Sequence, residues 1–252
     1  MNYKEVATAA RKKVLELIYK AGTSHIGSNF SVIDIATVLY NNLEDNERVV
    51  WSKGWAAATI YYFLAEQGKI PKEDLDKFPN APYLGLAELG VQGVYVTAGS
   101  VGQGLPVATG MAYAKKLSND VGRVFCIMSD GELDSGMVWE SARVAARHKL
   151  NNLVGIIDQN GWQALGRTEE VNGGDPREIF AAFGWAVQEV DGHRFEDIEW
   201  AIQQRHTKRP MIIVAKTIKC KGISFLEDKL ESHYLHITDE IYQKAIKELN
   251  AF

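Results

Sequence analysis

Apolar runs rich in Val and Ile alternate with helical patterns along most of this chain, and this alternation constrains the fold more than any other feature. After an early run, "ERVVW", the strand-like stretches are "VYVTAG", "RVFCIMS", "NLVGIID", "WAVQEVDG" and "PMIIVAKTI". Strands of this composition separated by helix-length segments predict a parallel sheet covered on both faces. The expected fold class is α/β, a doubly wound parallel sheet with helices on both faces. In such sheets ligands bind at the carboxyl ends of the strands.

Two helices are expected before the first strand. Apolar residues recur at three- and four-residue steps over 6–21, which places them on one helical face, and Gly22 can end that helix. A second helix is expected over 31–43, with Ser31 and Asp34 spaced as an imperfect capping box. No repeat, low-complexity tract or linker is visible, so a single domain spanning 1–252 is expected.

Charge and cysteine use limit the classes of function. The 252 residues carry a formal net charge of -4, which gives no general attraction for nucleic acid or for an anionic membrane. No apolar run approaches the length that spans a bilayer. Cys126 and Cys220 form no CxxC pattern and are interpreted as reduced thiols of a cytoplasmic protein, although a bond between them stays open. An anionic ligand must therefore be bound by local features.

Three carboxylates, Asp130, Glu132 and Asp134, follow directly on one apolar run. Like charges this close repel each other, so a fold tolerates them best when some face solvent or when a cation lies among them. Asn160 ends the next predicted strand, thirty positions (160 minus 130) after Asp130, so adjacent strands could bring the two side chains together. One carboxylate, one amide oxygen and one backbone carbonyl make a sparse site for Mg2+ or Ca2+, which a diphosphate ligand would complete.

The glycine-rich run "AGSVGQGLPVATG" tests a nucleotide hypothesis. Gly99, Gly102 and Gly104 are spaced GxxGxG, whereas the dinucleotide fingerprint requires GxGxxG. Leu105 follows the last glycine, where the phosphate-binding loop requires Lys. Both nucleotide interpretations are weak, and a nicotinamide-dependent oxidoreductase fails on the spacing. Taken alone, the run is explained by a tight turn between a strand and a helix.

The segment "SDGELDSGMVWESARVAARHKLNNLVGIIDQNGWQ" resembles the thiamine diphosphate motif of transketolases, in which Asp-Gly follows one strand and Asn ends the next. "AGTSHIGSNFSVIDI", "WSKGWA", "VTAGSVGQGLPVATGMA", "FAAFGWAVQEVDGH" and "IIVAKTIKCKGISF" also match family segments, in the family's order. The resemblance covers nearly the whole chain and implies thiamine diphosphate as the cofactor, held through Mg2+ or Ca2+.

The resemblance also implies a set of metal-binding and cofactor-binding residues. The metal would be bound by the side chains of Asp130 and Asn160 and by the backbone carbonyl of Trp162. The cofactor would also contact Gly131, whose N-H approaches the diphosphate, and the backbone of Gly99 and Val101, which would touch the aminopyrimidine. Asp130 and Asn160 thus belong to both sets.

Several further roles follow from the family's segments. His25, in "SHIG", matches a substrate-facing histidine that binds sugar hydroxyls and can move protons near neutral pH. His233, in "ESHYLH", resembles a histidine that contacts the diphosphate, and His236 is its competitor. His193, in "VDGH", is interpreted as a structural residue that orders a turn. Glu140 falls where the family has a buried interface glutamate, and a solvated helix face is the other interpretation.

The sequence departs from the family's pattern at four places. Trp55 replaces a histidine that normally lies by the cofactor, and its indole donates one hydrogen bond but carries no charge. The family's next histidine has no counterpart in "YLGLAELGVQG". Ser129 replaces the first glycine of the metal motif, and Ser135 replaces an acid usually paired at the interface. Two lost imidazoles weaken the expectation of ordinary phosphorylated ketoses as substrates.

The resemblance implies the amino-terminal subunit of a split transketolase, which passes a two-carbon ketol unit from a ketose phosphate to an aldose phosphate. Full transketolases carry a pyrimidine-binding and a carboxy-terminal domain after the domain that this sequence of 252 residues resembles. These two domains are expected on a separate chain, in an α2β2 heterotetramer. That partner would supply the activating carboxylate and the hydrophobic wedge for the cofactor, so the chain alone would be inactive. Two alternatives stay open: a related transfer on another sugar or keto substrate, and a cofactor-binding subunit that has lost catalysis.

Overall fold

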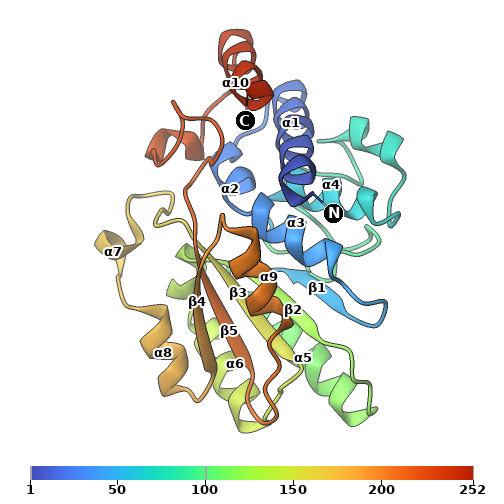
Figure 1. The fold of residues 1–252 in the computed structure, drawn as a ribbon, viewed down its shortest axis with the longest axis vertical. Coiled ribbons are helices and arrows are strands. Elements are labelled where there is room, and N and C mark those ends of the chain that lie inside the picture. Colours follow the sequence, from blue (N-terminus) through green and yellow to red (C-terminus); the bar gives the residue numbers. More distant parts are fainter. Residues whose placement is uncertain (1, 100, 252) are drawn as a thin grey trace.

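Five parallel strands form the centre of the molecule. The computed structural model describes residues 2–99 and 101–251, and it places the strands in the order β1-β2-β3-β5-β4 (Figure 1). Every pairing is parallel, from β1–β2 to β4–β5. The strands are β1 (Arg48–Trp51), β2 (Val124–Ser129), β3 (Leu153–Gln159), β4 (Ala186–Asp191) and β5 (Met211–Lys216).

Helices cover both faces of the sheet. Successive strand residues point to opposite faces, so Phe125 and Ile127 of β2 pack in one core and Cys126 and Met128 in the other. The first core includes α1 (Tyr3–Ala21), α3 (Ile33–Asn41), α4 (Ala57–Glu66), α9 (Phe195–Gln203) and α10 (Asp239–Ala251). The second includes α5 (Gly104–Leu117), α6 (Gly136–Arg147) and α8 (Pro176–Ala182). The doubly wound α/β fold predicted from the sequence is therefore confirmed.

Short elements connect these layers. They are α2 (Ile26–Ser31), α7 (Thr168–Val171) and the 3-10 helices η1 (Lys72–Lys77), η2 (Gly131–Asp134) and η3 (Leu230–His233).

The first helix follows its sequence pattern closely. Asn2 caps α1 by accepting a hydrogen bond from the Glu5 N-H, and the apolar stripe around Val14 and Ile18 is buried. Gly22 ends the helix at φ 62°, a left-handed conformation that glycine adopts without steric cost. Helix α1 packs against α3, α4 and α10, so the first and last helices lie side by side (Figure 1).

Two predictions about local structure were wrong. The run 94–99 is not a strand: it has no partner in the sheet, and Val96 and Ala98 instead pack into the core under α5. The second helix begins at Ile26 rather than Ser31 and is interrupted at Val32. No capping box forms there, because the Ser31 hydroxyl donates to the Asp158 carboxylate at 2.6 Å. In both places tertiary partners override the local pattern.

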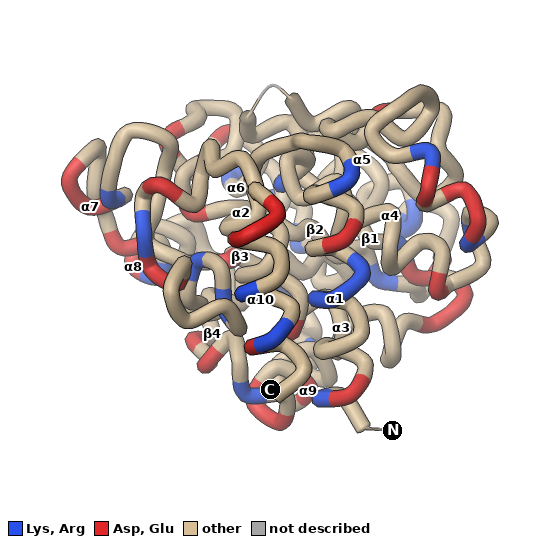
Figure 2. The backbone as a smooth tube through the Cα atoms, turned by 90° about the horizontal axis from the view of Figure 1, so that it is seen from above, with Lys and Arg blue, Asp and Glu red and all other residues tan. Residues whose placement is uncertain are grey.

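The surface carries both signs of charge. Figure 2 shows acidic and basic positions interleaved around the visible elements, in keeping with the small net charge. Within 2–99 and 101–251, no helix is long and apolar enough to cross a membrane. Cys126 and Cys220 are both buried and unpaired, so the bond that the sequence left open is absent.

Candidate functional site

Polar side chains gather where the strands end. Ser52 and Lys53 follow β1, Asp130 follows β2, Asn160 follows β3 and Thr217 follows β5. A cavity of about 320 Å³ lies at this edge, and we call it the sheet-edge cavity. Six of the residues predicted from the sequence line it: His25, Val101, Gly131, Asn160, Trp162 and His233.

The other two predicted residues lie outside the lining. Asp130 is buried, with 5% of its surface exposed, and lines a separate cavity of about 120 Å³ together with Asp134 and Thr168. Gly99 packs so closely on Leu86 that a Cβ atom there would come within 2.5 Å of the Leu86 Cδ2 atom. Ala98, its neighbour, lines the cavity instead. His236, the competitor of His233, lies near Gly22 rather than in this lining.

Asp130 joins the loops that follow β2 and β3. One carboxylate oxygen accepts from the Gly131 N-H at 2.9 Å, and the other accepts from the Gly161 N-H at 2.6 Å. Burial, with the nearby charge of Asp158, raises the pKa of Asp130 to about 7. The ionised form is therefore costly in the protein by itself, and a bound cation would stabilise it.

Asn160 and two glycines complete this corner. The Asn160 side-chain oxygen accepts from the Trp162 N-H at 3.0 Å, which fixes the turn after β3. Gly161 has φ +77°, a conformation that suits glycine. A Cβ atom on Gly131 would lie 3.1 Å from Gln163 Cγ, so the approach to the backbone there is narrow. A side chain at Gly131 would crowd a ligand that approaches its N-H.

The donor set fits a sparse cation site. In the described part of the chain, no three His, Cys, Asp or Glu side chains cluster in a way that could hold a metal ion. A cation at Asp130 would therefore depend on one carboxylate, the Asn160 amide oxygen, backbone carbonyl oxygens and oxygens of its ligand. Mg2+ suits this arrangement, since it commonly binds through one or two carboxylates together with phosphate and water.

The three acids after β2 have separate environments. Glu132 is buried and lines the cavity, and burial raises its pKa to about 7. Asp134 is exposed and accepts from the side-chain amides of Gln163 at 2.7 Å and Asn172 at 2.9 Å, which ties down the loop after β3. Of these three acids, Asp130 and Glu132 are buried and Asp134 faces solvent. The repulsion argument from the sequence expected at least some of the three carboxylates to face solvent.

A buried ion pair lies under the cavity, and sequence reasoning missed it. Asp158 is fully buried and pairs with the Lys53 ammonium group, which also lies 3.1 Å from the Ser31 hydroxyl. Thr217 donates a further hydrogen bond to Asp158. A signal was present, because Lys53 lies just after one predicted strand and Thr217 lies at the carboxyl end of another, and the carboxyl ends of parallel strands share one edge.

A second cation, Lys219, was also missed. Its ammonium nitrogen lies 3.5 Å from His233 Nδ1 and 5.4 Å from the centre of the Trp162 ring. Burial, together with the charge of Lys53, lowers the pKa of Lys219 to about 8. Lys219 is thus a partly desolvated cation beside the cavity, and Lys53 repels it although Lys53 is itself paired with Asp158. An anionic ligand would favour the charged form of Lys219.

Aromatic rings surround His25 at the mouth of the cavity. The imidazole stacks on Trp55 with ring centres 4.7 Å apart, and His233 and Tyr234 meet it edge-on. The Ser24 hydroxyl lies 2.7 Å from Nδ1, and the His25 N-H donates to the His233 carbonyl at 2.9 Å. Burial, followed by the charges of Lys219 and Lys53, lowers the pKa of His25 to about 4. The ring is therefore neutral at pH 7.

The two histidines predict how stability changes with pH. Burial and Lys219 also lower the pKa of His233 to about 4, against an ordinary value of 6.5. Between these values the unfolded chain binds protons that the folded chain does not, so the histidines should destabilise the fold as the pH falls from about 6.5 toward 4. As the pH falls over this range, we expect the free energy of unfolding, measured with urea, to decrease less in the double variant His25→Gln/His233→Gln than in wild type.

The comparison between wild type and variant isolates the histidines. Asp130 and Glu132, whose pKa values are raised, act in the opposite direction in both proteins, since they stabilise the fold as they bind protons. Equal pH dependence of unfolding in the two proteins would contradict the assignment.

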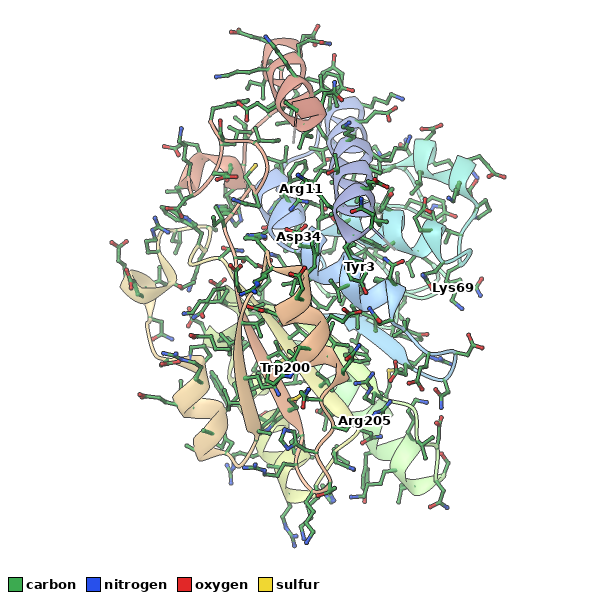
Figure 3. All side chains as sticks on the ribbon, viewed as in Figure 1. Tyr3, Arg11, Asp34, Lys69, Trp200 and Arg205 are labelled. Atoms are coloured by element: carbon green, nitrogen blue, oxygen red, sulfur yellow. The ribbon has the colours of Figure 1, made fainter. Side chains whose placement is uncertain are left out.

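His193 orders a turn, as the sequence suggested. Its Nδ1 lies 2.7 Å from the Asp34 carboxylate, and its Nε2 accepts from the Ile218 N-H at 2.8 Å. Arg11 makes two hydrogen bonds to the same carboxylate, and Figure 3 shows Arg11 and Asp34 together between α1 and α3. This buried group holds the segment that leads from β5 to Lys219.

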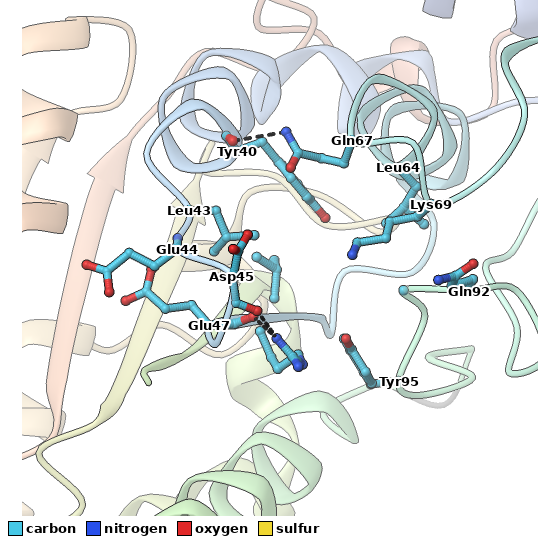
Figure 4. Close-up of a pocket in the computed structure, with 13 residues that line it drawn as sticks. Tyr40, Leu43, Glu44, Asp45, Glu47, Leu64, Gln67, Lys69, Gln92 and Tyr95 are labelled. Carbon is cyan, nitrogen blue, oxygen red and sulfur yellow. Dashed lines mark hydrogen bonds between the residues drawn. The ribbon is translucent and has the colours of Figure 1, made fainter. Parts of the chain in front are cut away.

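A second cavity, of about 270 Å³, lies at the opposite end of β1 (Figure 4). Tyr40, Glu47 and Lys69 contribute to its wall. The Glu47 carboxylate is already bonded to Arg123 Nε at 2.5 Å. None of the residues predicted from the sequence lines this cavity, and it lies at the amino end of the strand, away from the edge where ligands bind in such sheets.

The fold and the sheet-edge cavity define a parallel α/β protein with a cavity at the carboxyl ends of its strands, lined in part by polar side chains. Residues 2–249 match the family model described as "Transketolase, thiamine diphosphate binding domain". The chain therefore belongs to the transketolase family, and it corresponds to that domain.

Relatives of two lengths match it. The chain is 36% identical to a 6-deoxy-6-sulfo-D-fructose transketolase subunit of Clostridium sp. (strain MSTE9), covering 96% of this chain and 94% of the relative. It is 33% identical to an apulose-4-phosphate transketolase subunit of Phocaeicola vulgatus, covering 95% and 91%. The crystal structure of Campylobacter jejuni transketolase superposes with a TM-score of 0.91 at 28% identity, over 99% of this chain and 43% of that one. The chain thus spans less than half of the full-length transketolases that it matches.

Proposed function

We propose that this chain is the amino-terminal subunit of a split transketolase that transfers a two-carbon ketol unit from a ketose phosphate to an aldose phosphate. The observation that carries the proposal is the sheet-edge cavity, which Gly131 and Asn160 line, with Asp130 buried next to Gly131 and the buried Lys53 in the same lining. This combination suits a metal diphosphate, and the family match identifies thiamine diphosphate as the cofactor.

Each residue has a separate task in this proposal. Asp130, Asn160 and the Trp162 carbonyl hold Mg2+ (or Ca2+), and Gly131 offers its N-H to the diphosphate. Lys219 balances part of the remaining negative charge, and the neutral His233 imidazole beside it can donate a hydrogen bond to the diphosphate. Gly99 and Val101 contact the aminopyrimidine through backbone atoms. When bound, thiamine diphosphate supplies the electron sink for breaking a C-C bond.

His25 would act on the substrate. It is neutral at pH 7, and the Ser24 hydroxyl beside Nδ1 leaves Nε2 for the cavity. A neutral imidazole with one engaged nitrogen can bind a sugar hydroxyl and hold a proton at the other nitrogen. Its low pKa favours the hydrogen-bonding role over proton storage near neutral pH.

A partner chain is part of the proposal. The two subunit relatives match this chain nearly end to end, whereas human transketolase is matched over only 42% of its length. We propose one domain over 1–252, with the pyrimidine-binding and carboxy-terminal domains on a separate subunit in an α2β2 assembly. The buried, unpaired thiols support a cytoplasmic location.

A second candidate is transfer on a different sugar. Trp55 places an indole, with a single hydrogen-bond donor, in the lining of the cavity. The names of the two subunit relatives refer to a sulfonated fructose and to apulose 4-phosphate. A subunit that binds cofactor without catalysis remains the third candidate. Substrate panels separate the second candidate from the first, and cofactor binding without transfer would favour the third.

The test is ketol transfer from xylulose 5-phosphate to ribose 5-phosphate in the presence of thiamine diphosphate and Mg2+. We expect activity only when the chain is mixed with its carboxy-terminal partner subunit, because in this proposal the partner supplies the activating carboxylate and the hydrophobic wedge for the pyrimidine half. Chelation of the metal should abolish the activity. Transfer by the chain alone would contradict the split arrangement, and silence of the mixture with every ketose tried would contradict transketolase activity.

A further inference from the structure

We propose that Trp55 determines the substrate specificity of the sheet-edge cavity, by favouring a sugar that turns a C-H group rather than a hydroxyl toward it. This inference rests on the ketol-transfer function proposed above and names the class of sugar preferred: one that lacks a hydroxyl at the position facing Trp55. The contacts of Trp55, His25 and Asn29 carry it.

Asn29 ties together the two backbone segments that carry the rings of His25 and Trp55. Its side-chain amide nitrogen donates to the carbonyl oxygens of both His25 (3.0 Å) and Trp55 (3.3 Å). Its amide oxygen accepts from the Thr59 N-H at 3.0 Å, which anchors it to the start of α4. Asn29 itself is 2% exposed. The stack of Trp55 on His25, with an interplanar angle of 12°, is therefore built into the fold.

The wall formed by these rings offers little hydrogen bonding. Trp55 is 42% exposed and Tyr234 is 65% exposed, and both line the cavity. An indole has one N-H donor and no acceptor, whereas a neutral imidazole has both. Within 2–99 and 101–251, neither Nε2 of His25 nor the indole N-H of Trp55 forms a hydrogen bond with the protein. The stack therefore presents one imidazole nitrogen and one donor at the indole edge, while the indole face has neither donor nor acceptor.

This chemistry discriminates between sugars. A hydroxyl pressed against the indole face gives up its hydrogen bond to water and receives none in return, which costs affinity. A C-H group meets the negative face of an aromatic ring favourably and has no hydrogen bond to lose. A site that has no hydrogen-bond partner for a given hydroxyl therefore favours the sugar without that hydroxyl. A site that does hydrogen-bond the hydroxyl has the opposite preference and rejects the deoxy analogue.

The experiment compares D-fructose 6-phosphate with its 4-deoxy and 5-deoxy analogues as donors, all of which keep the hydroxyls at C1 and C3 that ketol transfer needs. The protein is the mixture of both subunits with thiamine diphosphate and Mg2+, carrying wild-type chain, Trp55→His, Trp55→Phe or Trp200→His. Trp200 is an exposed tryptophan on α9 and is the matched control. We expect wild type, Trp55→Phe and Trp200→His to favour one deoxy analogue. Trp55→His should shift that preference toward the parent sugar by about tenfold, through KM rather than kcat.

A second readout needs neither cofactor nor catalysis. Saturation-transfer NMR on the chain alone measures the contact of each sugar with indole protons. The part of the saturation transfer that is lost in the Trp55→Phe variant is assigned to Trp55. We expect this signal to be stronger for the favoured deoxy analogue, and Trp55→His to bind the parent sugar better than wild type does.

The outcomes separate the two proposals. Absence of transfer in every mixture counts against the ketol-transfer function, while the NMR comparison still tests Trp55. A deoxy-to-parent binding preference that is the same in wild type and Trp55→His would overturn the assignment. So would the absence of any Trp55 signal for all three sugars.

Discussion

Asp130→Asn is expected to weaken the binding of thiamine diphosphate with Mg2+ by at least about 100-fold, since even residues that only support metal ligands contribute about 10- to 100-fold to affinity. The substitution keeps the size of the side chain but removes the one carboxylate in the proposed metal site. Calorimetric titration of the subunit mixture with cofactor and Mg2+ measures the effect.

Stability measurements separate this role from a structural one. Burial raises the pKa of Asp130 to about 7, so its charge does not stabilise the ligand-free fold. We therefore expect the free energy of unfolding without ligand to fall by no more than about 1 kcal/mol, roughly one hydrogen bond. Asp76→Asn, on the exposed helix η1, is the matched control and should leave cofactor binding unchanged. Cofactor binding by Asp130→Asn that equals wild type would refute the assignment.

Asp158→Asn should produce the largest loss of stability, about 3–5 kcal/mol in the free energy of unfolding, because it leaves the buried Lys53 charge without its partner. The Ser31 and Thr217 hydroxyls also lose a charged acceptor. Chemical denaturation at pH 7 measures the change.

Two variants show whether the unpaired charge is the cause. Removing both charges in Lys53→Met/Asp158→Asn should recover part of the lost stability, since an apolar replacement of a buried pair is often tolerated. Glu16→Gln breaks the exposed pair with Lys20 and should change stability little. A loss below about 1 kcal/mol in Asp158→Asn would mean that the pair is not the main support of this edge.

Sequence patterns located the candidate site because a parallel sheet has a simple geometry. Asp130 and Asn160 each follow an apolar run, and in-register pairing of β2 with β3 brings their loops together. The same rule applied to β1 and β5 would have found Lys53 and Thr217, since Thr217 directly follows β5 and Lys53 lies one residue further beyond the end of β1. Lys219 was harder to find, because its burial depends on the loop of η3 that folds over it.

Local pattern failed where a distant residue competed for the same group. Ser31 has the spacing of a helix cap, but its hydroxyl serves Asp158, 127 positions away in the chain. The run 94–99 has strand composition, but its apolar side chains pack under α5 without joining the ladder. Neither partner is visible within a short window of sequence.

The sequence by itself determined the layers of this protein, the edge of the sheet at which the candidate site lies and the family to which it belongs. These depend on strand and helix periodicity and on motifs in a fixed order, and both are local properties of the chain. Only the tertiary structure decided which of the three acids are buried, which cations lie at the sheet-edge cavity, and that Trp55 stacks on His25. Burial and electrostatic environment arise from residues far apart in the sequence, and the folded chain alone brings them within contact distance.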